Sequence, residues 1–180
     1  TTGAAGAVVY TNSQSVTLTT TTALTAIWAP ATSGCVLTFN PGSGSGATYT
    51  QNFTSGTAFN LTAMVAQFTA PSSCYTFNGW ATTNGGSKAY NDQASVTLST
   101  TTTLYAVWAA TSNGCTVTFK AGTGTGSDYT QSFTAGTAFS LTSMVAQFTA
   151  PSTCYTFGGW TTGSDGSGTS YSNAASVTLT

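Results

Sequence analysis

Four cysteines are the residues of this chain best suited to chemistry, and they fall at two equal spacings. Cys35 and Cys74 lie 39 residues apart, and so do Cys115 and Cys154. A zinc site would need paired CxxC motifs or Cys/His clusters, and the chain has neither. The spacing therefore predicts two disulfides, Cys35–Cys74 and Cys115–Cys154. Each would stabilise the fold by about 4 kcal/mol in the chain-entropy model, and disulfides indicate an oxidising, extracellular location.

The charged residues are too few and too scattered to form a general catalytic site. They make up 3% of the chain, against about 25% in ordinary soluble proteins. The chain has no His, Glu or Arg, and its full set of charges is Lys88, Asp92, Lys120, Asp128 and Asp165. Proton transfer needs such groups placed together, and a serine nucleophile needs a base. We therefore expect no enzyme activity, no cofactor and no metal site.

The same shortage of charge excludes two classes of partner. Two lysines cannot form the basic patch that nucleic acid requires, nor a polybasic contact with a membrane surface. No apolar run approaches the roughly 20 residues of a membrane span. A net charge of −1 leaves little repulsion between copies, which favours self-association. The sequence predicts neither nucleic-acid binding nor membrane insertion.

Aromatic residues are the remaining candidates for ligand contact. Tyr10, Tyr90 and Tyr171 occupy matching positions and are candidate stacking residues for glycans. Core packing within strands is the simpler explanation for these tyrosines and for the four tryptophans. Asn52 and Asn60 begin N-x-Thr sequons and are candidate glycosylation sites. Host or surface glycans are therefore a partner class that the sequence leaves open.

These residues belong to a unit that repeats every 80 residues. When residues 35–80 are aligned with 115–160, 32 of 46 positions are identical, and the N-terminal stretch follows the same register. A repeat of this length is typical of arrays that build length or avidity. The chain is predicted to contain the C-terminal part of a module at 1–30, a complete module at 31–110, and a module lacking its last strand at 111–180.

Within the complete module, short apolar and alternating runs predict about five strands. They fall at 36–39, 49–53, 74–80, 95–98 and 104–108. Another set of apolar residues recurs at mixed spacing and predicts one short helical segment with Asn60 as its N-cap. This set is Phe59, Leu61, Met64, Val65 and Phe68. The predicted fold class is β-rich α+β.

The sequence resembles a known repeat family. The run YTFGGW at 155–160, Tyr171 in the following loop, ASVTL at 175–179 and the closing strand TLYAVW at 103–108 resemble the Listeria–Bacteroides repeat. This family includes the internalin B-repeats. The resemblance implies tandem β-grasp-like modules without catalysis, found in bacterial surface and secreted proteins and often in adhesins. The cysteines and the near absence of charge depart from the typical member, so the partners of charged relatives do not transfer.

The phase of the repeat predicts how modules join. Residues 111–180 lack the strand that 104–108 provides in the complete module, whereas 1–30 carry a closing strand without its opening half. Leu24, Ala26 and Trp28 are therefore predicted to form an assembly strand that completes the open module of a neighbouring copy. A longer tandem array in one polypeptide is the other explanation.

We therefore predict a structural subunit or segment of an extracellular bacterial filament or surface fibre. It would continue end to end by strand complementation or by chain continuity. Its partners would be copies of itself, arranged head to tail, or neighbouring repeats of a longer chain. A cell-surface adhesin or glycan-binding array that acts through avidity is the alternative.

Overall fold

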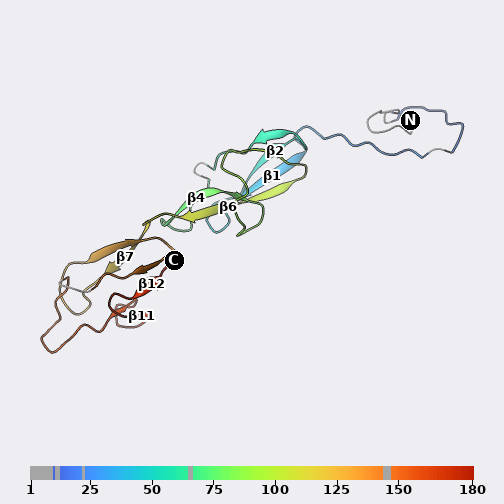
Figure 1. Cartoon of the computed structure of the whole chain (residues 1–180). Helices are drawn as coiled ribbons and strands as arrows, with labels where there is room; N and C mark the ends of the chain where they lie inside the picture. The colour runs from blue at the N-terminus through green and yellow to red at the C-terminus, as the bar shows by residue number, and fades with distance from the viewer. Residues whose placement is uncertain (1–9, 11–12, 22, 65–66, 144–146) are drawn as a thin grey trace.

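From Cys35 onward the chain forms strands arranged in two consecutive units. The structure is a computed structural model that describes residues 10, 13–21, 23–64, 67–143 and 147–180. Twelve strands lie in this part of the chain, and none of its residues is helical. The first unit contains β1–β6 and the second β7–β12, with the N-terminal segment extending away from the first unit (Figure 1).

The first unit is built on a mixed four-stranded sheet in the order β2-β1-β6-β4. The central strands β1 and β6 are parallel, and the two outer pairs are antiparallel. β3 and β5 form a separate antiparallel ribbon. The six strands are β1 (Cys35–Asn40), β2 (Tyr49–Phe53), β3 (Ala58–Asn60), β4 (Tyr75–Ala81), β5 (Ser95–Thr97) and β6 (Thr102–Ala110).

Alternation of side chains along these strands places the core on one face of the sheet. Leu37 and Phe39 of β1 are fully buried, whereas the intervening Thr38 is half-buried. Trp80 of β4 and Leu104 of β6 are also fully buried and belong to the same cluster. A period of two is what a strand requires to bury one face, so the sequence pattern and the observed core agree.

The second unit repeats the hairpins of the first but not its sheet. β7 pairs with β8, β9 with β12, and β10 with β11, each as a two-stranded ribbon. Among the described residues, β7 has no second neighbour of the kind that β6 provides for β1. The strands are β7 (Cys115–Phe119), β8 (Tyr129–Phe133), β9 (Ala138–Ser140), β10 (Trp160–Thr161), β11 (Ser170–Tyr171) and β12 (Ser176–Thr178).

The predicted β-rich class is confirmed, whereas the predicted helical segment is not found among the described residues. Residues 58–60 form β3, so Asn60 ends a strand instead of capping a helix. Gln51 explains the difference, because its side chain donates to Asn60 O at 2.8 Å and accepts from Thr62 N at 2.9 Å. These bonds satisfy the backbone in an extended conformation. Val65 lies outside the described residues, while Leu61 and Phe68 reach the core from irregular backbone.

Candidate functional site

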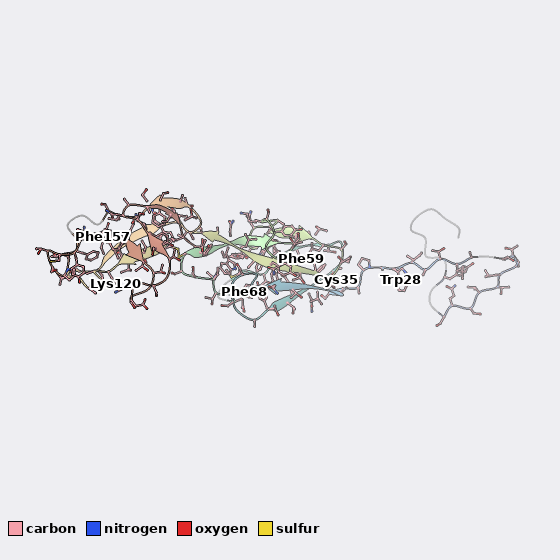
Figure 2. The ribbon with its side chains drawn as sticks, turned by 90° about the horizontal axis from the view of Figure 1, so that it is seen from below. Trp28, Cys35, Phe59, Phe68, Lys120 and Phe157 are labelled. Carbon is pink, nitrogen blue, oxygen red and sulfur yellow. A yellow bond between two sulfur atoms is a disulfide. The ribbon has the colours of Figure 1, made fainter. Side chains whose placement is uncertain are left out.

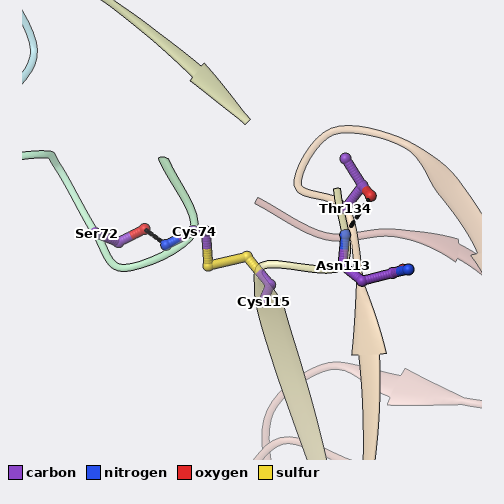
Figure 3. Close-up of a disulfide and its surroundings, with 5 residues drawn as sticks. All are labelled: Ser72, Cys74, Asn113, Cys115 and Thr134. Carbon is purple, nitrogen blue, oxygen red and sulfur yellow. Dashed lines mark hydrogen bonds between the residues drawn. A yellow bond between two sulfur atoms is a disulfide. The ribbon is translucent and has the colours of Figure 1, made fainter. Parts of the chain in front are cut away.

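The disulfide of this chain joins the two units and does not close either one. Cys74 is bonded to Cys115, with Cα atoms 4.8 Å apart and a sequence separation of 41 (Figure 3). Cys35 and Cys154 carry free thiols, the first half-buried and the second exposed. The prediction of one disulfide within each module, Cys35–Cys74 and Cys115–Cys154, is therefore wrong in this structure.

Strand direction explains why the pairing within a module fails. Cys35 opens β1, which runs parallel to β6 with Leu37 opposite Thr102. Cys74 precedes β4, which runs antiparallel to β6 with Tyr75 opposite Ala110. The two cysteines thus lie at opposite ends of the nine-residue strand β6, roughly 30 Å apart at 3.3 Å per residue. A disulfide needs Cα atoms within about 7 Å.

The bonded cysteines lie in a small apolar contact between the units, which we call the junction. Cys115, Phe133 and Ala135 of the second unit are buried there, and Cys74 and Tyr75 of the first unit pack against them. Two backbone donors support it: Thr111 N bonds Cys74 O at 2.8 Å, and Asn113 N bonds Thr134 Oγ1 at 2.9 Å (Figure 3). The junction is therefore a packed interface as well as a covalent link.

The predicted assembly strand is exposed throughout its described length. Residues 23–30 form no strand, Leu24 is 61% exposed and Trp28 is 90% exposed. Ala26 is exposed as well. Figure 2 shows Trp28 on the extended segment that precedes the first unit. These side chains are of the kind that the core buries elsewhere, so this segment has an apolar face without a neighbour among the described residues.

The equivalent residues of β6 show what such a strand does when it has a neighbour on each side. Leu104 is fully buried and Ala106 is buried. Trp108 packs against Phe77, with ring centroids 5.8 Å apart, and its Nε1 donates to Pro41 O at 2.9 Å. The same pattern of residues is therefore exposed at the N-terminus and buried in β6, and the difference lies in the surrounding sheet.

In the second unit, the position that β6 occupies in the first is vacant among the described residues. A Cβ added to Gly42 would meet Ala106 O of β6 at 2.6 Å, whereas one added to the equivalent Gly122 meets nothing within 4 Å. Tyr155 is 64% exposed, and residues 155–159 form no strand although their equivalents lie in β4. An unpaired sheet edge of this kind accepts an added strand. We call this vacant position the slot.

The three tyrosines predicted to stack on ligands have different surroundings. Tyr10 lies in the N-terminal segment and is 38% exposed. Tyr90 and Tyr171 are half-buried and pack against the cores of the first and second units. Tyr171 pairs with Trp160 across β10 and β11. An open cavity of about 330 Å³ runs beside this pair and is lined by Gly158, Gly159, Trp160, Thr161, Gly166, Ser170, Tyr171 and Ser172.

Asp92 is a structural residue that the sequence reasoning missed. Its carboxylate accepts bonds from Met64 N at 3.1 Å and from Trp80 Nε1 at 3.4 Å. In the second unit Asn173 occupies this place, and there Trp160 Nε1 is buried without a partner among the described residues. The signal in the sequence is that Asp92 aligns with Asn173, and both side chains carry an acceptor oxygen.

Asp92 also acts on the half-buried Tyr49, whose hydroxyl is buried. Burial, with a further contribution from the Asp92 charge, raises the pKa of Tyr49 to about 12. Tyr49 stacks on Phe39, with ring centroids 4.4 Å apart, and its hydroxyl has no hydrogen-bond partner among the described residues. Both effects disfavour the phenolate, so this tyrosine belongs to the core and not to a proton-transfer site.

The described residues hold neither a cluster of metal ligands nor a helix of membrane-spanning length. No three His, Cys, Asp or Glu side chains of the described residues come together as a metal site would require. No helix long and apolar enough to cross a membrane occurs in them either. Lys120 and Asp128 form an exposed ion pair at 2.6 Å, which is worth little to stability.

The sequence matches the model of a known repeat family. The sequence model described as Listeria-Bacteroides repeat domain matches twice, at residues 36–107 and 116–180. The two matches cover one unit each and together span most of the chain. No curated protein and no solved structure gives a significant match.

Proposed function

The chain belongs to the Listeria–Bacteroides repeat domain family, and from this premise we propose that it is a structural segment of an extracellular bacterial filament or surface fibre. The family is typical of bacterial surface proteins. The modules would continue end to end, each vacant slot receiving the closing strand of another module. The mechanism is passive packing, and it requires no catalytic group.

A single observation supports this proposal above the others: a vacant strand position and an exposed strand of matching sequence occur in one chain. The slot of the second unit lacks the neighbour that β6 gives to β1. Leu24, Ala26 and Trp28 repeat the apolar pattern Leu104, Ala106 and Trp108 of that neighbour. Adding a strand to an open edge pairs the backbone of both partners and buries their apolar faces.

A β-grasp-like fold for each module is part of the proposal. The order β2-β1-β6-β4, with its parallel central pair, supports it, because the first and last strands of the module lie side by side at the centre. On this basis the module boundaries are 1–30, 31–110 and 111–180. The vacant slot then lies at the end of module 111–180, and the donated strand lies at the end of module 1–30.

Denaturing electrophoresis of the native material separates strand complementation from chain continuity. After boiling and reduction, complementation gives a band near 18.1 kDa. A band far above that mass would show a longer tandem chain and overturn strand donation between copies. Electron microscopy of the same material should show fibres in either case, and isolated particles would contradict the structural role itself.

A glycan-binding array is the second candidate function. The cavity beside Trp160 and Tyr171 supports it, because it sets an aromatic pair among hydroxyl and glycine residues. Sugars bind such surfaces by stacking and hydrogen bonding. A glycan array probed with the 180-residue chain tests it, with Tyr171→Ala as the variant that should lose binding. Binding that is unselective, or unchanged in the variant, would reject this candidate.

A further inference from the structure

The two free cysteines stand at the same positions in the repeat as the two bonded ones. Cys154 is equivalent to Cys74 and Cys35 is equivalent to Cys115, each 80 residues away. We propose that Cys154 of one copy forms a disulfide with Cys35 of the next, so that the polymer is joined covalently at every junction. This inference rests on the head-to-tail arrangement proposed above and adds a bond that strand donation alone does not require.

The backbone before Cys154 already has the conformation found at the bonded cysteine. Cys154 N bonds Ser152 Oγ at 3.3 Å, and Tyr155 N bonds Ser152 O at 3.2 Å. The turn before Cys74 contains the same two bonds at the same two distances, formed by Ser72. The free thiol is therefore held on a preformed turn, and bonding requires no local refolding.

The backbone before Cys35 matches its bonded counterpart in the same way. Ser33 N bonds Thr54 Oγ1 at 3.1 Å, and Asn113 N bonds Thr134 Oγ1 at 2.9 Å. Ser33 and Asn113 also share a left-handed conformation, with φ of 54° and 53°. This conformation is unusual for residues other than glycine, so its recurrence before both cysteines indicates that the two loops are built alike.

The apolar surfaces around the two free thiols are complementary. Tyr155 is 64% exposed beside Cys154, whereas its equivalent Tyr75 packs into the junction beside Cys115. Cys35 is half-buried at the end of the first unit that faces the N-terminal segment (Figure 2). It packs in a cluster with Phe53 and Phe59, the equivalents of the junction residues Phe133 and Phe139. The exposed Tyr155 of one copy can therefore pack against the Phe53 and Phe59 cluster of a second copy, as Tyr75 packs in the junction.

The spacing between strand and cysteine allows one docking event to satisfy both contacts. β6 ends at Ala110, five residues before Cys115. The matching segment 22–30 ends five residues before Cys35. When segment 22–30 of one copy fills the slot of another, the register of the first unit brings Cys35 beside Cys154. The occupant of the slot is thus a second copy of this chain, in one orientation.

The bond forms by thiol–disulfide exchange with a small-molecule disulfide such as oxidised glutathione. The Cys154 thiolate attacks one sulfur of the oxidant, forms a mixed disulfide and releases one thiol. The Cys35 thiolate of the next copy then displaces the second thiol. Two protein thiols become one disulfide, and the oxidant is reduced to two small thiols. The oxidising conditions that maintain Cys74–Cys115 also permit this step.

Two variants test the pairing because each retains one of the two free cysteines. Cys35→Ser and Cys154→Ser, one of them carrying a tag that changes its mass, are incubated with oxidised glutathione separately and together. We expect a single mixed dimer on non-reducing denaturing gels of the mixture and monomers for each variant alone. The unaltered chain should give a ladder that reductant removes. Dimers in either variant alone, or no dimer in the mixture, would overturn the proposal.

Trypsin mapping identifies the bond, because cleavage after Lys88 and Lys120 leaves the fragments 1–88, 89–120 and 121–180. Cys74–Cys115 joins the first two fragments, and its presence shows that each variant has folded. The proposed bond joins 121–180 to 1–88.

Sedimentation in reducing buffer reports strand donation separately. Assembly there, with no mixed disulfide in the oxidised mixture, overturns the covalent bond alone, whereas a chain that stays monomeric overturns strand donation between copies as well and leaves only continuity within a longer chain.

Discussion

At the scale of single residues, Cys115 has the largest predicted contribution to stability. Its disulfide constrains the unfolded chain over 41 residues, and its side chain is buried in the junction. Cys115→Ser should lower the free energy of unfolding by about 4 kcal/mol, measured by urea denaturation in dilute solution. The matched control Cys154→Ser changes an exposed free thiol and should stay within about 0.5 kcal/mol. Equal effects of the two substitutions would contradict this assignment.

Tyr49 makes stability depend on pH in the alkaline range. Its pKa is about 12 in the folded protein and 10.0 ordinarily. The stabilisation is therefore complete below pH 10 and is lost as the pH rises toward 12, because the unfolded chain releases its proton first. In Tyr49→Phe, the thermal midpoint should fall less steeply than in the unaltered chain between pH 10 and 12. Equal slopes would reject the role of Tyr49.

At pH 7 the same substitution should be harmless. The Tyr49 hydroxyl is buried and has no partner among the described residues, so its removal breaks no hydrogen bond there. We expect Tyr49→Phe to equal or exceed the stability of the unaltered chain when thermal midpoints are compared. Tyr10→Phe, at an exposed tyrosine, is the control that should leave the midpoint at pH 7 unchanged.

At the scale of elements, Trp108 and Trp28 form a matched pair in equivalent strands. Trp108→Ala removes the contact with Phe77 and the bond to Pro41, and should lower the free energy of unfolding by about 3 kcal/mol. Trp28→Ala should leave it within about 0.5 kcal/mol while reducing assembly measured by sedimentation. Unchanged assembly in Trp28→Ala would contradict the role of the N-terminal segment as the donated strand.

The strands were predictable because their signal is local. The short apolar run at 36–39 predicted β1, and the alternation of large and polar residues at 49–53 predicted β2. The segment after Phe59 has no such signal. There the side chain of Gln51, from another strand, satisfies the backbone and displaces the predicted helix. A contact between segments ten residues apart cannot be recognised from the periodicity of either one.

The candidate site was predictable in its composition but not in its connectivity. The repeat identified the four cysteines and the assembly strand, because both recur in register. It did not give the pairing, since Cys35–Cys74 and Cys74–Cys115 differ by only two residues in separation. The parallel arrangement of β1 and β6 determines which cysteines meet, and strand direction is a property of the sheet that spacing does not contain.

At the scale of the whole molecule, the shortage of charge should govern how copies associate. Charged residues make up 3% of the chain, and the described ion pair, Lys120–Asp128, is exposed. Assembly by strand addition relies on backbone pairing and apolar burial, which salt does not screen. Raising sodium chloride from 50 mM to 1 M shortens the screening length roughly fivefold. Sedimentation over this range should show no loss of assembly. A marked loss at high salt would indicate a charged interface.

A head-to-tail polymer is directional, so a peptide that fills the slot should end its growth. A synthetic peptide of residues 20–31, added in reducing buffer before assembly, competes with the same segment of another copy for the vacant position in the second unit. Because each polymer exposes one vacant slot at one end, its mean length should fall toward the ratio of subunits to peptide. Analytical ultracentrifugation measures this length.

A control peptide carrying Leu24→Asp and Trp28→Ala lacks the apolar face that β6 buries through Leu104 and Trp108, and should leave the length unchanged. Equal shortening by both peptides, or by neither, would exclude insertion of this strand as the step that joins the copies.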